Sequence, residues 1–179
     1  MMEYTAVASL AREAGFDHMA PLDPATIELK TEVRQMCQAC FQHDKRWSCP
    51  PGCGTLEQCG QRIAAYRQGI LVQSVGQLED EFDGEGMMET EQLQKERFRS
   101  LHEALCRAGI PVLAIGNGCC SLCKECTYPD TPCRFPEKMV SSMEACGMVV
   151  ADVCRANNLP YYYGKNTIAY TCCILFDRV

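Results

Sequence analysis

Four cysteines at close and regular spacing are the feature of this chain that is most able to do chemistry. Residues 119–136 contain the pattern C-x2-C-x2-C-x6-C, formed by Cys120, Cys123, Cys126 and Cys133. Three cysteines at steps of three can converge on one point when the backbone winds as a loose turn. A fourth cysteine in a proline-flanked stretch then closes the shell. The spacing therefore predicts that these four thiolates hold metal together.

Iron–sulfur clusters and zinc both accept four thiolates, and the spacing favours the first. Bacterial ferredoxins hold a [4Fe–4S] cluster with a C-x2-C-x2-C run, although their last gap is shorter and their fourth cysteine ligates a partner cluster. Zinc takes four thiolates in a tetrahedron, but two adjacent C-x2-C steps suit it less well than two separate hairpins. We expect a [4Fe–4S] cluster here, with zinc as the alternative.

A second group of cysteines lies earlier in the chain and consists of Cys37, Cys40, Cys49, Cys53 and Cys59. The pair Cys37-x2-Cys40 and the Cys49-Pro-Pro51 segment together indicate a second site, since a proline beside a ligand fixes φ and stiffens the loop. The fourth ligand stays open. Cys53 lies in a glycine-rich turn, whereas Cys59 lies in the first turn of a predicted helix, whose dipole would stabilise a thiolate.

The other candidate ligands near these groups favour ordinary structural roles. His43 could complete a zinc or Rieske-type shell, but the charged residues that follow it favour a solvated loop histidine. Cys119 is expected to be a packing thiol, and Cys106, Cys146 and Cys154 are expected to be small buried apolar residues on helix faces. Cys172 and Cys173 are neighbours in a predicted strand, so their side chains must point to opposite faces.

The composition indicates a globular, acidic protein in a reducing compartment. The chain has 179 residues, of which 47% are apolar and 22% charged, and a formal net charge of −6. The acidic balance gives no global attraction for nucleic acid or anionic membranes. No apolar run approaches the length of a membrane helix, and residues 1–5 lack the start of a signal peptide. With fifteen cysteines, these features favour the cytoplasm of an organism that lives in anaerobic or strongly reducing conditions.

The intervening segments predict the helices and strands that must carry the cysteine loops. Apolar residues at helical spacing, with capping boxes at Thr55 and Ser141, predict helices over residues 5–14, 55–66, 93–108 and 141–154. Runs of β-branched and aromatic residues predict strands over 27–29, 70–75, 110–115 and 167–176. Two prolines, Pro21 and Pro24, predict one loop, and the acidic stretch 80–88 predicts another.

A strand–helix–strand unit is the centre of the expected fold. Residues 70–75, 93–108 and 110–115 form a βαβ pattern, which favours parallel pairing and a right-handed crossover. Ligands tend to gather beyond the carboxyl ends of such strands, where the loop 116–118 leads into the second cysteine group. We expect one α/β domain over residues 1–179, with a mixed sheet, flanking helices and cysteine-rich metal loops.

Five short motifs occur in this order along the chain: Val33-Arg-x2-Cys37-x2-Cys40, Trp47-x-Cys49-Pro-Pro51, Leu56-x2-Cys59, Pro132-Cys-Arg-Phe-Pro136 and Ser142-Met-Glu-Ala-Cys-Gly147. This combination resembles a family of uncharacterised predicted metal-binding proteins, found mostly in anaerobic bacteria and archaea. The resemblance runs from about Val33 to the last predicted strand. It implies iron–sulfur binding and a shared site for Cys37, Cys40 and Cys49. It implies no reaction, because the family has no assigned one.

Three functional hypotheses follow from these observations. The first is an iron–sulfur protein with two [4Fe–4S] centres that passes single electrons to a redox partner. The second is an iron–sulfur enzyme, in which a site with only Cys37, Cys40 and Cys49 leaves one iron open as a Lewis acid toward a small substrate. The third is a zinc-stapled interaction module without redox chemistry. Redox-active iron would separate the third hypothesis from the other two.

Overall fold

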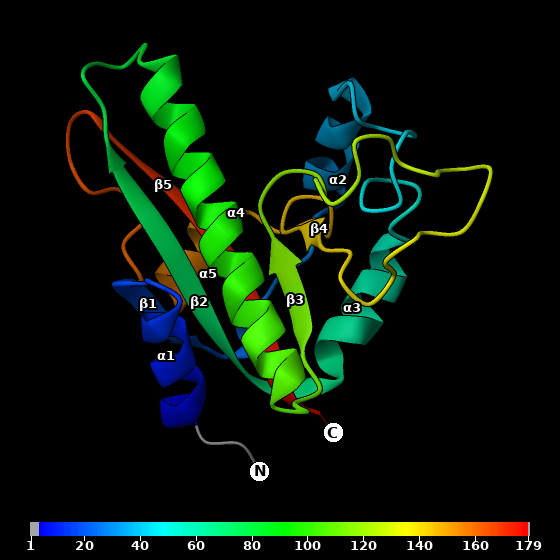
Figure 1. Ribbon diagram of the computed structural model, residues 1–179, viewed down its shortest axis with the longest axis horizontal. Coiled ribbons are helices and arrows are strands. Elements are labelled where there is room, and N and C mark those ends of the chain that lie inside the picture. The colour runs from blue at the N-terminus through cyan, green and yellow to red at the C-terminus, as the bar shows by residue number, and fades with distance from the viewer. Residues whose placement is uncertain (1–3, 179) are drawn as a thin grey trace.

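The computed structural model describes residues 4–178, which form a mixed sheet with helices against both faces and cysteine-rich loops beside it (Figure 1). The helices are α1 (Tyr4–Glu13), α2 (Thr31–Met36), α3 (Leu56–Ala64), α4 (Gly84–Arg107) and α5 (Val150–Ala156), with 3-10 turns at Pro24–Thr26 and Cys37–Ala39. The strands are β1 (His18–Leu22), β2 (Tyr66–Gln77), β3 (Leu113–Gly116), β4 (Ser141–Ser142) and β5 (Thr167–Arg178). The expected mixed α/β architecture is confirmed.

The strand order β1-β2-β5-β3-β4 puts the last strand in the interior of the sheet. Strand β5 pairs antiparallel with both β2 and β3, whereas β3 pairs parallel with β4. Strands β2 and β3 therefore run in the same direction and are joined by α4, as a strand–helix–strand unit requires. The prediction that they pair directly is wrong, because β5 is apolar on both faces and lies between them.

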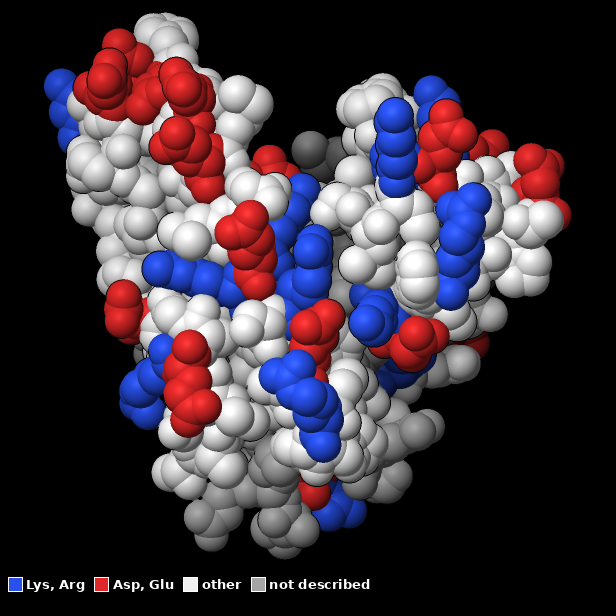
Figure 2. Space-filling view, in the orientation of Figure 1, with Lys and Arg blue, Asp and Glu red and all other residues white. Residues whose placement is uncertain are grey.

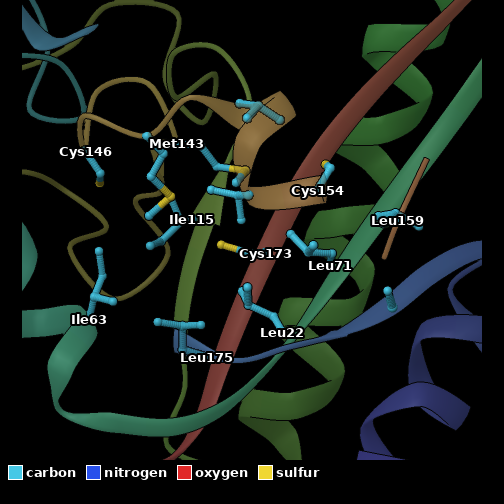
Figure 3. Close-up of a cluster of buried hydrophobic side chains, with 14 of the residues drawn as sticks. Leu22, Ile63, Leu71, Ile115, Met143, Cys146, Cys154, Leu159, Cys173 and Leu175 are labelled. Atoms are coloured by element: carbon cyan, nitrogen blue, oxygen red, sulfur yellow. The ribbon is translucent and has the colours of Figure 1, made fainter. Parts of the chain in front are cut away.

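Both faces of β5 are buried in separate core layers. Cys172, Ile174 and Phe176 face α1 and α4, where they pack with residues such as Phe98 and Leu101. Cys173 and Leu175 face the other layer, which α3, α5 and the turn after β4 cover (Figure 3). Alternation along a strand explains this division. The predicted opposite orientation of Cys172 and Cys173 is confirmed, and both side chains are fully buried.

Strand β1 replaces the loop that the prolines predicted. Residues 18–22 pair antiparallel with β2, and Pro21 lies opposite Ile70. A proline has no N–H to donate, and β1 tolerates it because this strand is at the edge of the sheet. The strand predicted over residues 27–29 is also wrong, since only Leu29 makes a single bridge, with Met148.

Helix α4 begins earlier than the sequence indicated. Asp83 caps it by accepting a hydrogen bond from the backbone N–H of Gly86 at 2.9 Å, so residues 84–88 are helical instead of part of an acidic loop. The Asp83 carboxyl accepts a second hydrogen bond from the backbone N–H of Glu79, and the two bonds together lower its pKa. Cys106, near the end of α4, is exposed, so its predicted burial is wrong.

The capping box predicted at Ser141 does not start a helix. Ser141 and Ser142 instead form β4, paired with Ile115 and Gly116. The side chain of Ser142 accepts a hydrogen bond from the N–H of Ala145 at 3.0 Å, which stabilises a turn. Gly147 then takes a φ of 87°, and helix α5 begins only at Val150. By contrast, the capping box at Thr55 and the helix after it are confirmed.

None of the helices within residues 4–178 is both long enough and apolar enough to cross a bilayer.

Candidate metal centre

The second cysteine group lies on the irregular segment between β3 and β4, which passes beside α3 and the first cysteine loop (Figure 1). Its four predicted ligands, Cys120, Cys123, Cys126 and Cys133, are all partly buried. They line one small cavity, of about 20 Å³, whose other walls include Trp47 and Phe135. The structure thus brings the four thiols of this group to the same hollow.

Side-chain to backbone hydrogen bonds hold this segment in shape. Arg134 Nη1 donates to the carbonyl of Glu125 at 2.9 Å, and Thr127 Oγ1 donates to the carbonyl of Pro132 at 3.0 Å. Both bonds cross the gap between Cys126 and Cys133. They set the path of the six residues that separate the third and fourth cysteines, which no helix or strand supports.

The two cysteine groups are in contact, although they are far apart in the sequence. Ser48 Oγ accepts a hydrogen bond from the backbone N–H of Cys120 at 3.1 Å, and Arg46 Nη1 donates to the carbonyl of Cys120 at 3.1 Å. Both ends of the Cys120 peptide unit are therefore bound by the loop that carries Cys49. The two loops that carry the predicted sites are therefore neighbours.

Aromatic residues extend this contact away from Cys120. Trp47 Nε1 donates to the carbonyl of Thr131 at 3.1 Å. The Trp47 ring meets the edge of Tyr128 at 4.9 Å between centroids, and the Tyr128 hydroxyl donates to Asp44 Oδ1 at 2.8 Å. Edge-to-face ring pairs of this kind add to the stability given by burial. The contact therefore runs along much of both loops.

Cys49 is the most central thiol of the first group. It is buried, and burial raises its pKa to about 11. The nearby thiols of Cys119, Cys53 and Cys40 act in the same direction, because a second negative charge would disfavour a thiolate at Cys49. Cys119 therefore lies beside the first group, while Cys120 belongs to the second. Sequence spacing gave no sign of this, since the neighbour comes from a loop contact.

Cys59 lies in a different environment, between two arginines. Arg62 Nη2 is 3.1 Å and Arg34 Nη1 is 3.8 Å from the Cys59 sulfur. The thiol of Cys146 also donates to this sulfur, and that hydrogen bond is the largest cause of the lowered pKa of Cys59, ahead of the arginines. The same bond and burial raise the pKa of Cys146. Cys146 is buried as predicted, but its contact with Cys59 was not foreseen.

Cys53 lies between these two environments. Its charge interacts with Cys59 and Cys146 on one side and with Cys49 on the other. The backbone N–H of Cys53 also donates to the carbonyl of Cys49 at 3.1 Å. Of the two candidates for the fourth ligand, Cys53 is therefore the direct neighbour of Cys49, and the choice between them stays a prediction.

The thiols of both groups are of the chemical type that binds metal as thiolates. Burial raises the pKa of Cys120, with backbone N–H groups of Leu122 and Val140 acting against it. A metal would have to displace that proton, as thiolate sites generally require. Within the described part of the chain, no three Cys, His, Asp or Glu side chains close tightly enough around one point to hold a single ion.

The comparisons with known proteins give one match. The model of a family described as predicted metal-binding protein (DUF2284) matches residues 20–176, which include every cysteine of the chain. No curated protein matches the chain, and no solved structure matches it either.

Proposed function

This chain belongs to the family of predicted metal-binding proteins, and from that premise we propose that it holds two [4Fe–4S] clusters and passes single electrons to a redox partner. The observation that carries the proposal is the shared cavity of Cys120, Cys123, Cys126 and Cys133. Four thiolates from one C-x2-C-x2-C-x6-C segment are the donor set that such a cluster uses. When bound, a cluster of this kind accepts or releases one electron.

The second proposed site uses Cys37, Cys40 and Cys49, with Cys53 or Cys59 as the fourth ligand. Support comes from the charge interactions that connect Cys49 with Cys40 and Cys53, and Cys37 with Cys40. The bond between Ser48 and Cys120 holds this loop against the other cysteine segment. Two neighbouring centres would let an electron that enters at one loop leave from the other.

The surrounding side chains would control the potential of the sites. Trp47, Leu122 and Phe135 give the cavity of the second group part of its apolar wall. Arg46 and Arg134 line the same cavity, and their positive charges would offset the negative charge of a thiolate-ligated cluster. Both arginines donate to backbone carbonyls of the 117–139 segment, so their positions are fixed.

A redox partner would need an accessible surface near these sites. Met36 and Phe41, on either side of Cys37 and Cys40, are 74% and 75% exposed. Apolar side chains that remain exposed beside a functional loop are suited to contact with another protein. Cys40 itself is exposed, which leaves little protein between the first group and a docked partner.

The test is metal analysis of protein purified without oxygen. We expect about eight iron and eight acid-labile sulfide per chain, and an EPR signal after reduction. Cys126→Ala should remove about half of the iron, while Cys106→Ala, which changes an exposed cysteine outside both groups, should leave the iron content unchanged. Stoichiometric zinc without iron or sulfide would reject the electron-transfer proposal in favour of a zinc-stapled module.

A further inference from the structure

Two buried thiols meet where α3 packs against the turn that follows β4. Cys59 of α3 and Cys146 of the turn are 1% and 4% exposed, and the thiol of Cys146 donates a hydrogen bond to the sulfur of Cys59. Figure 3 shows the Cys146 side chain directed toward the part of α3 that carries Ile63. Two sulfurs in hydrogen-bond contact are close enough for a disulfide to form with small movements of the side chains.

The backbone on the Cys146 side of this contact is held firmly against α3. Gly147 has a φ of 87°, and a Cβ added there would meet Leu56 Cδ1 at 2.5 Å, so the turn and the helix are in close contact. The backbone N–H of Lys30 donates to the carbonyl of Gly147 at 2.7 Å and holds the turn from its other side. The approach of the two thiols is therefore part of the fold and needs no rearrangement of the chain.

Two positive charges distinguish the sulfur of Cys59 from that of Cys146. Arg62 Nη2 lies 3.1 Å and Arg34 Nη1 lies 3.8 Å from the Cys59 sulfur. Neither arginine forms an ion pair with an acidic residue within residues 4–178. On the face drawn in Figure 2, the largest group of acidic side chains lies over the start of α4, apart from the cysteine loops. Uncompensated guanidinium groups beside a sulfur favour the thiolate, which is the form that attacks a disulfide.

A small cavity gives a path to the pair. It has a volume of about 50 Å³, and Cys59, Cys146 and Arg62 line it together with apolar residues such as Met139. A cavity needs only about 10–15 Å³ by this kind of measure to hold a water molecule, so this one admits the reactive end of a larger molecule. No acidic residue is part of its lining.

We propose that Cys59 and Cys146 form a reversible disulfide by exchange with a low-molecular-weight disulfide, and that this bond ties α3 to the turn after β4. The Cys59 sulfur attacks one sulfur of the small disulfide, whose S–S bond breaks, and one small thiolate leaves. The Cys146 sulfur then attacks the Cys59 sulfur and displaces the second small thiolate, and a released thiolate takes the proton of Cys146. The two cysteines lose two electrons, and the small disulfide is reduced to two thiols.

This modification goes beyond the proposed electron transfer and does not depend on which metal the protein holds. A sulfur that takes part in a disulfide is not a thiolate ligand. The proposal therefore leaves Cys53 as the fourth ligand of the first centre, and it gives Cys59 a role of its own.

Equilibration of the metal-loaded full chain with a thiol–disulfide buffer tests this inference. The protein is held without oxygen in mixtures of hydroxyethyl disulfide and mercaptoethanol, and free thiols are then alkylated. Tryptic peptides are analysed by mass spectrometry. We expect a pair of peptides linked through Cys59 and Cys146, in a yield that rises with the ratio of disulfide to thiol and falls to zero after reduction. Absence of this link at every ratio, or a link from Cys59 to a different cysteine, overturns the proposal.

Serine variants separate the two roles in the exchange. Cys146→Ser leaves Cys59 without its resolving partner, so it should accumulate a mixed disulfide of Cys59 with one mercaptoethanol. Cys59→Ser should leave Cys146 unmodified, because the attacking sulfur is missing. Cys154→Ser changes another buried cysteine of the same core cluster and should form the link as the wild type does.

Circular dichroism and metal content show whether each variant is folded and loaded. A folded Cys146→Ser protein without a mixed disulfide at Cys59 rejects the proposed order of attack, and the wild-type result decides the proposal even where a variant does not fold. Protein that holds zinc instead of iron but forms the link would reject only the electron-transfer function. Protein that holds iron and sulfide but forms no link would reject only the disulfide.

Discussion

The side-chain oxygen of Ser48 lies 3.1 Å from the backbone nitrogen of Cys120, and this hydrogen bond joins the two cysteine groups across 72 residues of sequence. Ser48 is only 1% exposed, so water has little access to replace it. The adjacent residues of these two, Cys49 and Cys119, interact through their charges. This serine is therefore a buried part of the contact between the first cysteine loop and the second.

Replacing Ser48 by alanine should loosen this contact. The variant leaves the partly buried N–H of Cys120 without its acceptor, which costs about 0.5–1.5 kcal/mol of unfolding free energy. Hydrogen–deuterium exchange should become faster at residues 119–123 and stay unchanged in β5. Ser121→Ala, at an exposed serine in the same segment, is the matched control. Unchanged exchange at Cys120 in the Ser48 variant would show that the bond does not hold the loops together.

Cys49 and Cys119 should differ in their effect on metal content, although they are neighbours. Cys49→Ala should remove the iron of one centre and leave the spectrum of the other centre unchanged, because Cys49 is a predicted ligand. Cys119→Ala should leave the iron content unchanged, because Cys119 is predicted to be a packing thiol. Iron and sulfide analysis with EPR measures both. Loss of a centre in the Cys119 variant alone would show that Cys119 is the ligand and Cys49 the packing thiol.

Metal should order the cysteine segment more than it orders the sheet. Residues 117–139 include no helix or strand, and Leu122, Tyr128 and Phe135 are the main apolar anchors of the cysteine run within it. So little apolar surface cannot offset the entropy of ordering the backbone, and metal–thiolate bonds must supply the difference.

The apo protein should therefore keep most of its helical circular dichroism while trypsin cleaves it rapidly after Lys124 and Arg134. Matched metal-loaded protein should resist cleavage at these two residues. Arg97, which is part of α4 and donates to Ser74 Oγ at 3.3 Å, should be protected in both forms. Equal resistance at Lys124 in both forms would mean that packing alone orders the segment.

The unfolding free energy should decrease as pH falls below about 6.5, because of His102. Burial lowers its pKa from the usual 6.5, so the unfolded chain binds a proton at higher pH than the folded one. Between the pKa of His102 in the unfolded chain and its lower pKa in the folded chain, the unfolding free energy decreases as pH falls. The contribution of His102 to stability is fully retained above pH 6.5. His102→Gln should flatten this part of the curve, as measured by urea denaturation between pH 5 and 7.5. Parallel curves for variant and wild type would show that His102 is not the cause.

The sequence predicted local features more reliably than pairings between distant segments. The Thr55 capping box and its helix depend on residues three apart, and both form as expected. The position of β5 between β2 and β3 depends on partners 58 to 112 residues away, which no local pattern encodes. The Ser141 capping box has the right residues, but pairing of β4 with β3 takes precedence over helix formation.

The candidate site divides in the same way. The spacing of Cys120, Cys123, Cys126 and Cys133 indicated which thiols would share a cavity, because one short segment supplies them all. The approach of Cys119 to Cys49, and of Cys146 to Cys59, arises where separate loops meet. Such contacts arise from tertiary packing, so the spacing of cysteines in the sequence does not predict them.

The interior position of β5 has a consequence for the order of events during synthesis. Residues 167–178 leave the ribosome after both cysteine groups, yet β2 and β3 have no direct pairing without them. Until β5 has paired, β2 and β3 do not form one sheet. The contact between the two cysteine loops then lacks the scaffold that fixes β3 and β4. The delivery of metal to a nascent chain would therefore meet separate, mobile thiols. Delivery after β5 has paired would meet the assembled pair of loops, so the timing of metal insertion decides whether the sites fill one by one or together.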